Sequence, residues 1–160
     1  MPVLRKADRY IEEYDRPACG PVRGEWLTPT GTLTQFGAVI ETLPPGSRSS
    51  IKHWHAEEDE FVLALEGEVT LVEGAEVHIL HPGDAATFRA GVPVGHCLEN
   101  RTTVPCRYLV VGTRAAQEVA TYPDHNRIAI MRADSDETIW TDLDRAPADN
   151  PYRRAYDDRD

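Results

Sequence analysis

The sequence has few cysteines, almost no lysine and no long hydrophobic run. Its three cysteines lie at positions 19, 97 and 106, an odd number without the paired spacing of a zinc ribbon. Structural disulfides are therefore not expected, and a reducing cytoplasm is the simplest location. No apolar stretch approaches the roughly 20 residues of a membrane span. Residues 1–10 are charged and lack the apolar core of a signal peptide, so we expect a cytoplasmic protein without membrane contact.

The charge balance is acidic, with 27 Asp and Glu residues against 17 Lys and Arg residues and a formal net charge of -10. Nucleic acids and anionic membranes are themselves polyanions, so neither is an expected partner. The hydrophobic share of 41% and the charged share of 28% are those of an ordinary globular chain. The length of 160 residues suffices for one domain with a proper core.

The chain divides into three zones. Residues 1–32 contain four prolines and three glycines, which predicts an extended N-terminal arm. Residues 33–113 form the expected barrel domain. Residues 114–160 become polar, with nine acidic and four basic residues from Asp134 onward, and we expect a C-terminal extension that packs on the barrel or is partly mobile.

Short β-type segments separated by turn residues fill the middle zone. One hairpin is predicted between Glu60–Leu65 and Glu68–Val72, and a second between Val72 and Glu76–Leu80. Seven or eight such strands with regular turns are typical of an all-β sandwich or barrel. Further strands are expected at Leu33–Leu43, Ala86–Phe88, His96–Asn100 and Val104–Val111.

A pair of histidines marks the most informative segment. Residues two apart in a strand point to the same face, so His53 and His55 would present two imidazoles side by side. A carboxylate a few residues later can return to that face, and His96 lies on a later expected strand. Such ligands suit Fe, Mn, Ni, Co, Cu or Zn. A His-x-His pair alone is more often incidental, so the metal hypothesis depends on the surrounding residues.

Two motifs surround these histidines. In the first, Gly46 precedes His53 by seven residues, and Glu60 is followed by six residues and then Gly67. The second contains a Pro-Gly-Asp turn at 82–84, a Gly-Val-Pro turn at 91–93, His96 and, four residues later, Asn100. Together these motifs resemble those of the cupin superfamily over about half of the chain.

The resemblance implies an all-β fold with a single cupin barrel, which is a double-stranded β-helix or jelly roll. Carried over position by position, the ligands of the family fall on His53, His55, Glu60 and His96, and they imply one divalent transition metal (Fe, Mn, Zn, Ni, Co or Cu). The first gap is one residue longer than the commonest form, and the loop before His96 departs from the family pattern. The phrases at 48–55 and 108–114 resemble small single-domain bacterial cupins, some of them provisionally named sugar-phosphate isomerases.

Two further residues are candidates for contacting a substrate. Arg89, beside the altered loop, would supply a cation for an anionic ligand, with a solvated surface charge as the alternative. Tyr108 would either turn its hydroxyl to the pocket or serve as a core aromatic. Glu60, as a ligand, is not free to act as a base, and spacing assigns no other carboxylate to the pocket. The sequence therefore names no catalytic residue.

Three functional hypotheses result. The first is a metal-dependent enzyme that acts on a small polar metabolite, a sugar phosphate or carboxylate, as an isomerase, a lyase or an Fe(II) dioxygenase. The second is a non-catalytic module that binds a small molecule or a metal, and the third is a scaffold. Strands that are apolar on both faces, together with the pairing of similar cupins, predict a homodimer.

Overall fold

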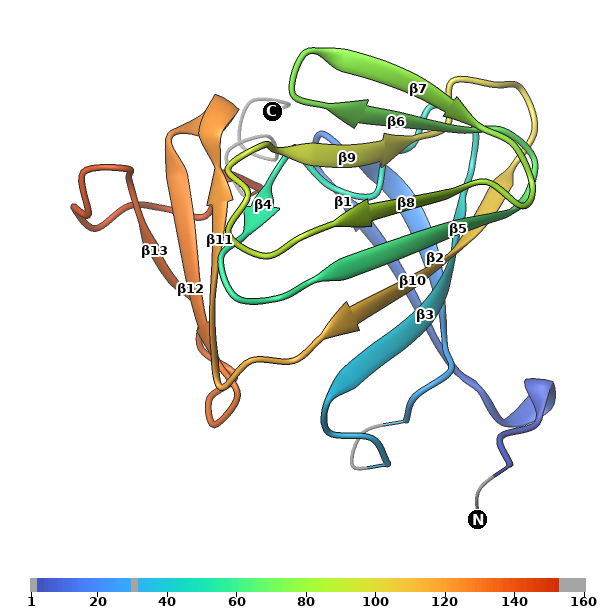
Figure 1. Ribbon diagram of the computed structural model, residues 1–160, viewed down its shortest axis with the longest axis horizontal. Coiled ribbons are helices and arrows are strands. Elements are labelled where there is room, and N and C mark those ends of the chain that lie inside the picture. The colour runs from blue at the N-terminus through green and yellow to red at the C-terminus, as the bar shows by residue number, and fades with distance from the viewer. Residues whose placement is uncertain (1–2, 30–31, 153–160) are drawn as a thin grey trace.

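The computed structural model of the protein describes residues 3–29 and 32–152. Almost all of the regular structure in these residues is β-strand (Figure 1), which confirms the all-β prediction. The largest sheet is antiparallel and has six strands. In spatial order they are β1 (Tyr10–Arg16), β2 (Gly20–Trp26), β3 (Phe36–Leu43), β10 (Cys106–Thr113), β5 (Glu60–Glu66) and β8 (Ala85–Phe88).

Two smaller antiparallel sheets complete the described part of the fold. One has the order β7 (Glu76–Leu80), β6 (Val69–Glu73) and β9 (His96–Glu99). The other has the order β13 (Ile139–Thr141), β12 (Arg127–Arg132), β11 (Gln117–Tyr122) and β4 (Trp54–His55). Short 3-10 turns occur at η1 (Lys6–Asp8) and η2 (Pro123–His125). Among the described residues, no helix has the length and apolar character that crossing a membrane requires.

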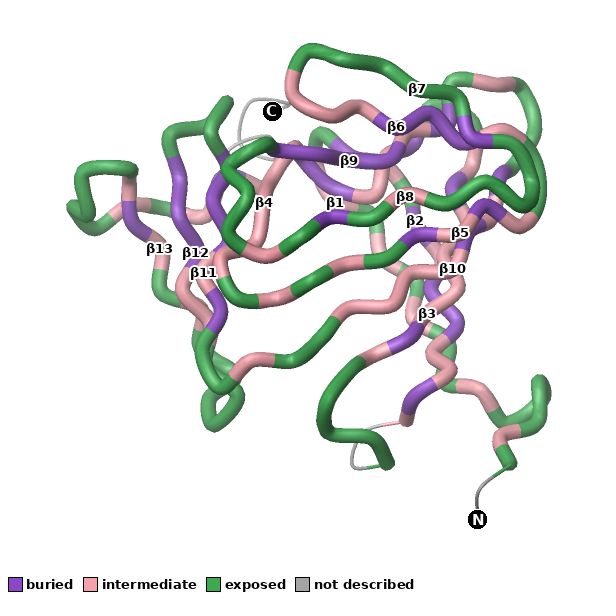
Figure 2. The backbone as a smooth tube through the Cα atoms, viewed as in Figure 1, coloured by how far each residue is buried: buried purple, intermediate pink, exposed green. Residues whose placement is uncertain are grey.

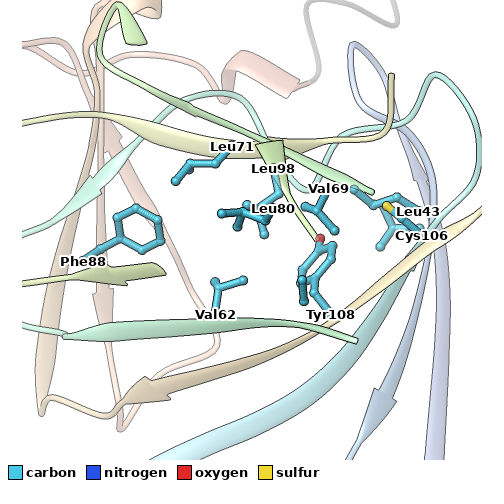
Figure 3. Packing of buried hydrophobic residues seen from close by; sticks show 11 residues of the cluster. Leu43, Val62, Val69, Leu71, Leu80, Phe88, Leu98, Cys106 and Tyr108 are labelled. Carbon is cyan, nitrogen blue, oxygen red and sulfur yellow. The ribbon is translucent and has the colours of Figure 1, made fainter. Parts of the chain in front are cut away.

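The main core lies between the six-stranded and the three-stranded sheets (Figure 3). Val62 and Phe88 of the larger sheet pack in one cluster with Leu71 and Leu98 of the smaller sheet. Burial of each such side chain stabilises the fold by about 1.5–3 kcal/mol. Figure 2 shows buried residues recurring along the strands that face this layer. Two facing sheets around one core are the arrangement of a jelly roll, as predicted.

The chain does not form the first predicted hairpin. β5 pairs with β10 and β8, whereas β6 pairs with β7 and β9 in the other sheet. Gly67 has a φ of +72°, and a Cβ there would lie 2.9 Å from the carbonyl oxygen of Pro105. The glycine therefore carries the chain from one sheet to the other rather than closing a hairpin. The second predicted hairpin, β6–β7, is confirmed by pairing from Val69–Leu80 to Glu73–Glu76.

The N-terminal segment, expected as an extended arm, is more regular than that. β1 and β2 form a hairpin that continues the largest sheet beyond β3. The turn residues Ala18 and Gly20 have φ values of 66° and 78°. Pro21 lies outside the β2–β3 pairing, which begins at Arg23, so its missing N–H interrupts no bond to β3. Of the prolines and glycines that suggested an arm, Pro17 and Gly20 lie at the β1–β2 turn, whereas Gly24 lies within β2 and pairs with Glu12 and Glu41.

The C-terminal extension packs on the rest of the molecule through a second apolar cluster. Ala120, Tyr122 and Ala129 from its strands contact Cys19 and Ile51. β11 also pairs with β4, the short strand that carries one of the paired histidines. The extension was also expected to be partly mobile. For residues 153–160 this prediction lies outside the described residues.

Candidate metal centre

Backbone pairing brings the motif histidines together. His53 and His96 form an isolated antiparallel bridge in which each backbone N–H donates to the carbonyl oxygen of the other, at 3.1 and 2.9 Å. His55 lies on β4, and Glu60 begins β5. Residues 43 positions apart in the chain thus become neighbours because β9 returns beside the segment before β4.

The four side chains approach one another through their polar atoms. The Nε2 atoms of His53 and His55 are 3.1 Å apart. The carboxylate oxygens of Glu60 lie 3.8 Å from His55 Nε2 and 3.5 Å from His96 Nε2. The structure therefore brings together all four residues that the cupin resemblance indicates as ligands.

The protonation of His53 suits a ligand role. Its Nδ1 lies 3.0 Å from the carbonyl oxygen of Ile51, and only a protonated Nδ1 can donate to a carbonyl. This assigns the lone pair of the neutral ring to Nε2, which faces His55. Burial and the neighbouring His55 lower the pKa of His53 from 6.5 to about 4, so the imidazole is neutral near pH 7.

A carboxylate lies on the far side of the His55 ring. Glu118 Oε1 lies 3.6 Å from His55 Nδ1, and the Glu118 carboxylate accepts backbone N–H bonds from Ala56 and Glu57 at 2.9 and 3.1 Å. Burial alone would lower the pKa of His55, but Glu118 and Glu60 outweigh it and raise the pKa. A carboxylate behind a ligating imidazole commonly fixes the ring and strengthens its basicity.

His55 also belongs to a second group of potential ligands. Its ring, Glu58 and Glu118 offer atoms that all lie within 4.8 Å of one another. The Glu118 carboxylate already accepts two backbone N–H groups, and the Glu58 carboxylate accepts the N–H of Ala115 at 2.8 Å. The group around His53 is the better candidate because it contains three imidazoles and a carboxylate.

His96 provides a direct test of whether a metal fits. Its ring is buried, and within the described part of the chain neither of its nitrogens has a hydrogen-bond partner. The ring stacks on Phe88 with centroids 3.6 Å apart and planes 5° apart, which fixes its orientation. A buried imidazole without a partner is costly, and a cation between Nε2 and Glu60 would satisfy it. The donor set suits a divalent transition metal.

These residues line a cavity of about 500 Å³ inside the barrel. Tyr108 is fully buried, belongs to the main apolar cluster and also lines this cavity. It is therefore a core aromatic, and its hydroxyl is bonded to Glu41, another residue of the cavity. Arg89 is exposed and lines a separate cavity of about 160 Å³, which shares His55 and His96 with the larger one. The two predicted substrate contacts therefore lie in different cavities.

The structure adds a carboxylate that sequence reasoning missed. Glu41, on β3, lines the large cavity together with the histidines. It accepts hydrogen bonds from the hydroxyls of Tyr108 at 2.6 Å and Tyr14 at 3.2 Å. Burial raises the pKa of Glu41 and outweighs the two tyrosine hydrogen bonds, which lower it. A buried carboxyl group with a raised pKa is a candidate for proton transfer.

A sequence signal for Glu41 existed. The residue lies two positions after Val39 and two before Leu43, which is fully buried. Strand alternation places these three side chains on one face. A charged residue among apolar neighbours on the inner face is unusual in a strand. Three further cavity residues that sequence reasoning missed, Glu12, Tyr14 and Arg16, lie on the segment that was expected to be an arm.

Comparisons with known proteins agree with this architecture. The family model for the cupin domain matches residues 39–112. A solved structure of a sugar phosphate isomerase from a cupin superfamily, from Silicibacter pomeroyi, is 39% identical, with 82% of each chain covered and a TM-score of 0.75. A protein of Acidithiobacillus ferrooxidans, provisionally named a sugar phosphate isomerase, is 25% identical, with 81% of each chain covered and a TM-score of 0.72.

More distant likenesses show the fold alone. The polyketide cyclase RemF from Streptomyces resistomycificus is 23% identical, with 71% of this chain and 79% of that chain covered and a TM-score of 0.60. No curated protein is detectably similar to the chain. Both the 39% identity across 82% of the chain and the domain match support one assignment. The chain belongs to the cupin superfamily.

Proposed function

We propose that the protein is a metal-dependent enzyme that isomerises or cleaves a small polar metabolite, a sugar phosphate or a hydroxylated carboxylate. The observation that carries the proposal is the position of Glu41 in the same cavity as His53, His55, Glu60 and His96. In this proposal, a carboxyl group with a raised pKa and four candidate metal donors surround one space for a substrate. The names of the two relatives above support the sugar-phosphate class.

The four metal donors would hold one divalent cation, which when bound would polarise a carbonyl oxygen of the substrate. His53 contributes a neutral imidazole because its Nδ1–H is held by the Ile51 carbonyl. The Glu118 carboxylate lies 3.6 Å from Nδ1 of His55, on the side of the ring away from the other donors. The identity of the metal stays open among Fe, Mn, Zn, Ni, Co and Cu.

Glu41 would move the proton. In its ionised form the carboxylate takes a proton from the hydroxyl-bearing substrate carbon beside a carbonyl. The resulting carboxylic acid returns it to the former carbonyl carbon, while the hydroxyl proton passes to the former carbonyl oxygen, or it protonates a leaving oxygen as the C–O bond at the next carbon breaks. The first outcome is an isomerisation and the second a cleavage or elimination. The hydroxyls of Tyr108 and Tyr14 hold the carboxyl group in position during both transfers.

Metal analysis of protein purified without chelators or nickel affinity resin is the first test. We expect about one equivalent of metal per chain, lost in His53→Ala and His96→Ala and kept in His78→Ala, which alters an exposed histidine. The second test is incubation with a panel of aldose and ketose phosphates and hydroxy acids in deuterated water, with deuterium incorporation followed by NMR. We expect exchange at the carbon beside the carbonyl.

Each alternative gives a different result. Metal without turnover, together with a ligand that raises the melting temperature, would indicate a binding module. Bound iron with oxygen consumption would indicate a dioxygenase. Absence of metal, with full function in His53→Ala and His96→Ala, would overturn the proposal in favour of a scaffold.

We further propose a cytoplasmic homodimer. Its apolar contacts would come from the outer faces of the sheets, where Phe61, Val77 and Ile79 are exposed in the single chain. Light scattering at micromolar concentration should give twice the chain mass of 17.9 kDa. A mass equal to one chain would contradict the dimer.

A further inference from the structure

Arg16 occupies a distinctive place at the end of β1. Its side chain lines the large cavity that also contains Glu41 and the candidate metal ligands. The guanidinium carbon lies 4.4 Å from the ring centroid of Tyr14 and 5.4 Å from that of Tyr152. Stacking on two aromatic rings restrains an arginine without consuming its N–H donors.

Those donors have no protein acceptor in the part of the chain that the structure describes. Within residues 3–29 and 32–152, the guanidinium of Arg16 forms neither an ion pair nor a hydrogen bond. Other arginines are paired with carboxylates: Arg9, Arg23, Arg107, Arg127 and Arg132. A guanidinium that is oriented, half-buried and unpaired beside a cavity is available to a ligand.

Two acidic residues of the same cavity, Glu12 and Glu41, are otherwise engaged. Glu12 accepts the indole N–H of Trp26 at 3.0 Å, and Glu41 accepts the two tyrosine hydroxyls. Neither carboxylate lies within ion-pair distance of Arg16 in the described structure. Arg16 is therefore not neutralised by a direct contact with either of them.

A serine hydroxyl is available in the same space. Ser49 lines the cavity, and its Oγ accepts the backbone N–H of Leu98 at 3.0 Å. Because Oγ acts as the acceptor in this bond, its own proton remains available to a ligand oxygen. The cavity wall thus offers a planar guanidinium fork and a neutral hydroxyl donor.

We propose that Arg16 binds the anionic group, a phosphate or carboxylate, of the small molecule that enters the large cavity. The proposal deepens the function above and rests on it only for the identity of the natural ligand. A guanidinium matches both groups through two parallel N–H···O bonds. Of the two candidate cations, Arg16 and Arg89, the proposal favours Arg16, because Arg89 lines the smaller cavity.

Calorimetric titration with inorganic phosphate, and separately with acetate, tests the site directly. We expect the wild-type protein to bind phosphate at millimolar or lower concentration. Arg16→Gln should weaken binding at least tenfold, and Arg16→Lys less, because lysine keeps the charge but not the fork. Arg89→Gln, the matched control, should bind as the wild type does. Preference for acetate would assign the site to carboxylates, preference for phosphate would assign it to phosphoryl groups, and equal binding would show that Arg16 accepts either anion.

The same titrations are repeated after removal of metal with a chelator, because a bound metal can itself bind phosphate. The effect of Arg16→Gln should persist in the metal-free protein, with circular dichroism confirming that the variant is folded. Absence of binding of both anions to the wild type, equal binding by Arg16→Gln, or loss of binding in Arg89→Gln instead would overturn the proposal. If binding depends on Arg16 but the protein holds no metal and shows no turnover, the Arg16 proposal is supported. The same result would refute the proposed enzymatic function.

Discussion

Glu41 and Tyr108 lie directly opposite each other on neighbouring antiparallel strands, and the Tyr108 hydroxyl donates a 2.6 Å hydrogen bond to the Glu41 carboxylate. Opposed residues on adjacent strands project from the same face of the sheet. Both side chains therefore enter the barrel interior together. The register of β3 and β10 thus decides which hydroxyl donates to the Glu41 carboxylate, and this hydrogen bond lowers the pKa that burial raises.

Glu41→Gln should make stability less sensitive to pH. The pKa of Glu41 is raised above its ordinary value of 4.5, so the stability that its proton contributes is complete below pH 4.5 and is lost as pH rises through the folded-state pKa. The melting temperature of Glu41→Gln relative to the wild type should therefore increase above pH 4.5 and then level off. Scanning calorimetry from pH 4 to 9 measures it, with the exposed Glu76→Gln as control. A constant difference across this range would contradict a raised pKa.

Tyr108→Phe should raise the pKa of Glu41 further, because the lost hydrogen bond favours the ionised carboxylate. The shift can be followed by NMR titration of protein labelled at the glutamate carboxyl carbons, with Glu41→Gln to assign the resonance. Tyr14→Phe is the matched control, and its 3.2 Å bond predicts a smaller shift. Each variant should lose about 0.5–1.5 kcal/mol of stability. A fall in the pKa after Tyr108→Phe would refute the assigned role of the hydroxyl.

Glu118→Gln should weaken metal binding without abolishing it. The carboxylate behind His55 accepts two backbone N–H groups and lies 3.6 Å from Nδ1. Loss of such a partner lowers metal affinity by about 10- to 100-fold. Competition with a fluorescent chelator measures the change, and Glu57→Gln, exposed in the segment after β4, should have no effect. Complete loss of metal in Glu118→Gln would instead indicate a direct ligand.

Gly67→Ala should destabilise the protein more than Gly46→Ala. Both glycines have positive φ values, of +72° and +80°, and so share the conformational penalty of about 1–2 kcal/mol for a side chain. Only at Gly67 would the added Cβ meet backbone, 2.9 Å from the Pro105 oxygen, and such overpacking adds about 1–3 kcal/mol. Urea unfolding of the two variants gives the comparison. Equal losses would show that the contact with Pro105 is relieved without cost.

The fold class and the second hairpin could be predicted from alternation and turn residues, which are local signals. The cupin resemblance indicated His53, His55, Glu60 and His96, and the structure brings these side chains together, while their role as metal ligands stays a prediction. Glu41 and Arg16 were missed because their roles depend on long-range pairing. Glu41 meets Tyr108 only through the β3–β10 register, and Arg16 reaches the cavity only through the β1–β2 hairpin. Strand order between sheets is equally non-local, so the β5–β6 hairpin was predicted wrongly.

The large cavity is lined both by residues inside the cupin-domain match and by residues outside it. The family match at 39–112 contains the histidines, Glu60 and Glu41. Tyr14, Arg16 and Tyr152 lie outside that match, on the strands and turns that flank it. Under the proposal above, the residue that binds the anionic group lies in β1, outside the domain match, whereas Glu41 and the candidate metal ligands lie inside it. Substitutions in β1 should therefore change ligand binding while the candidate metal centre stays in place.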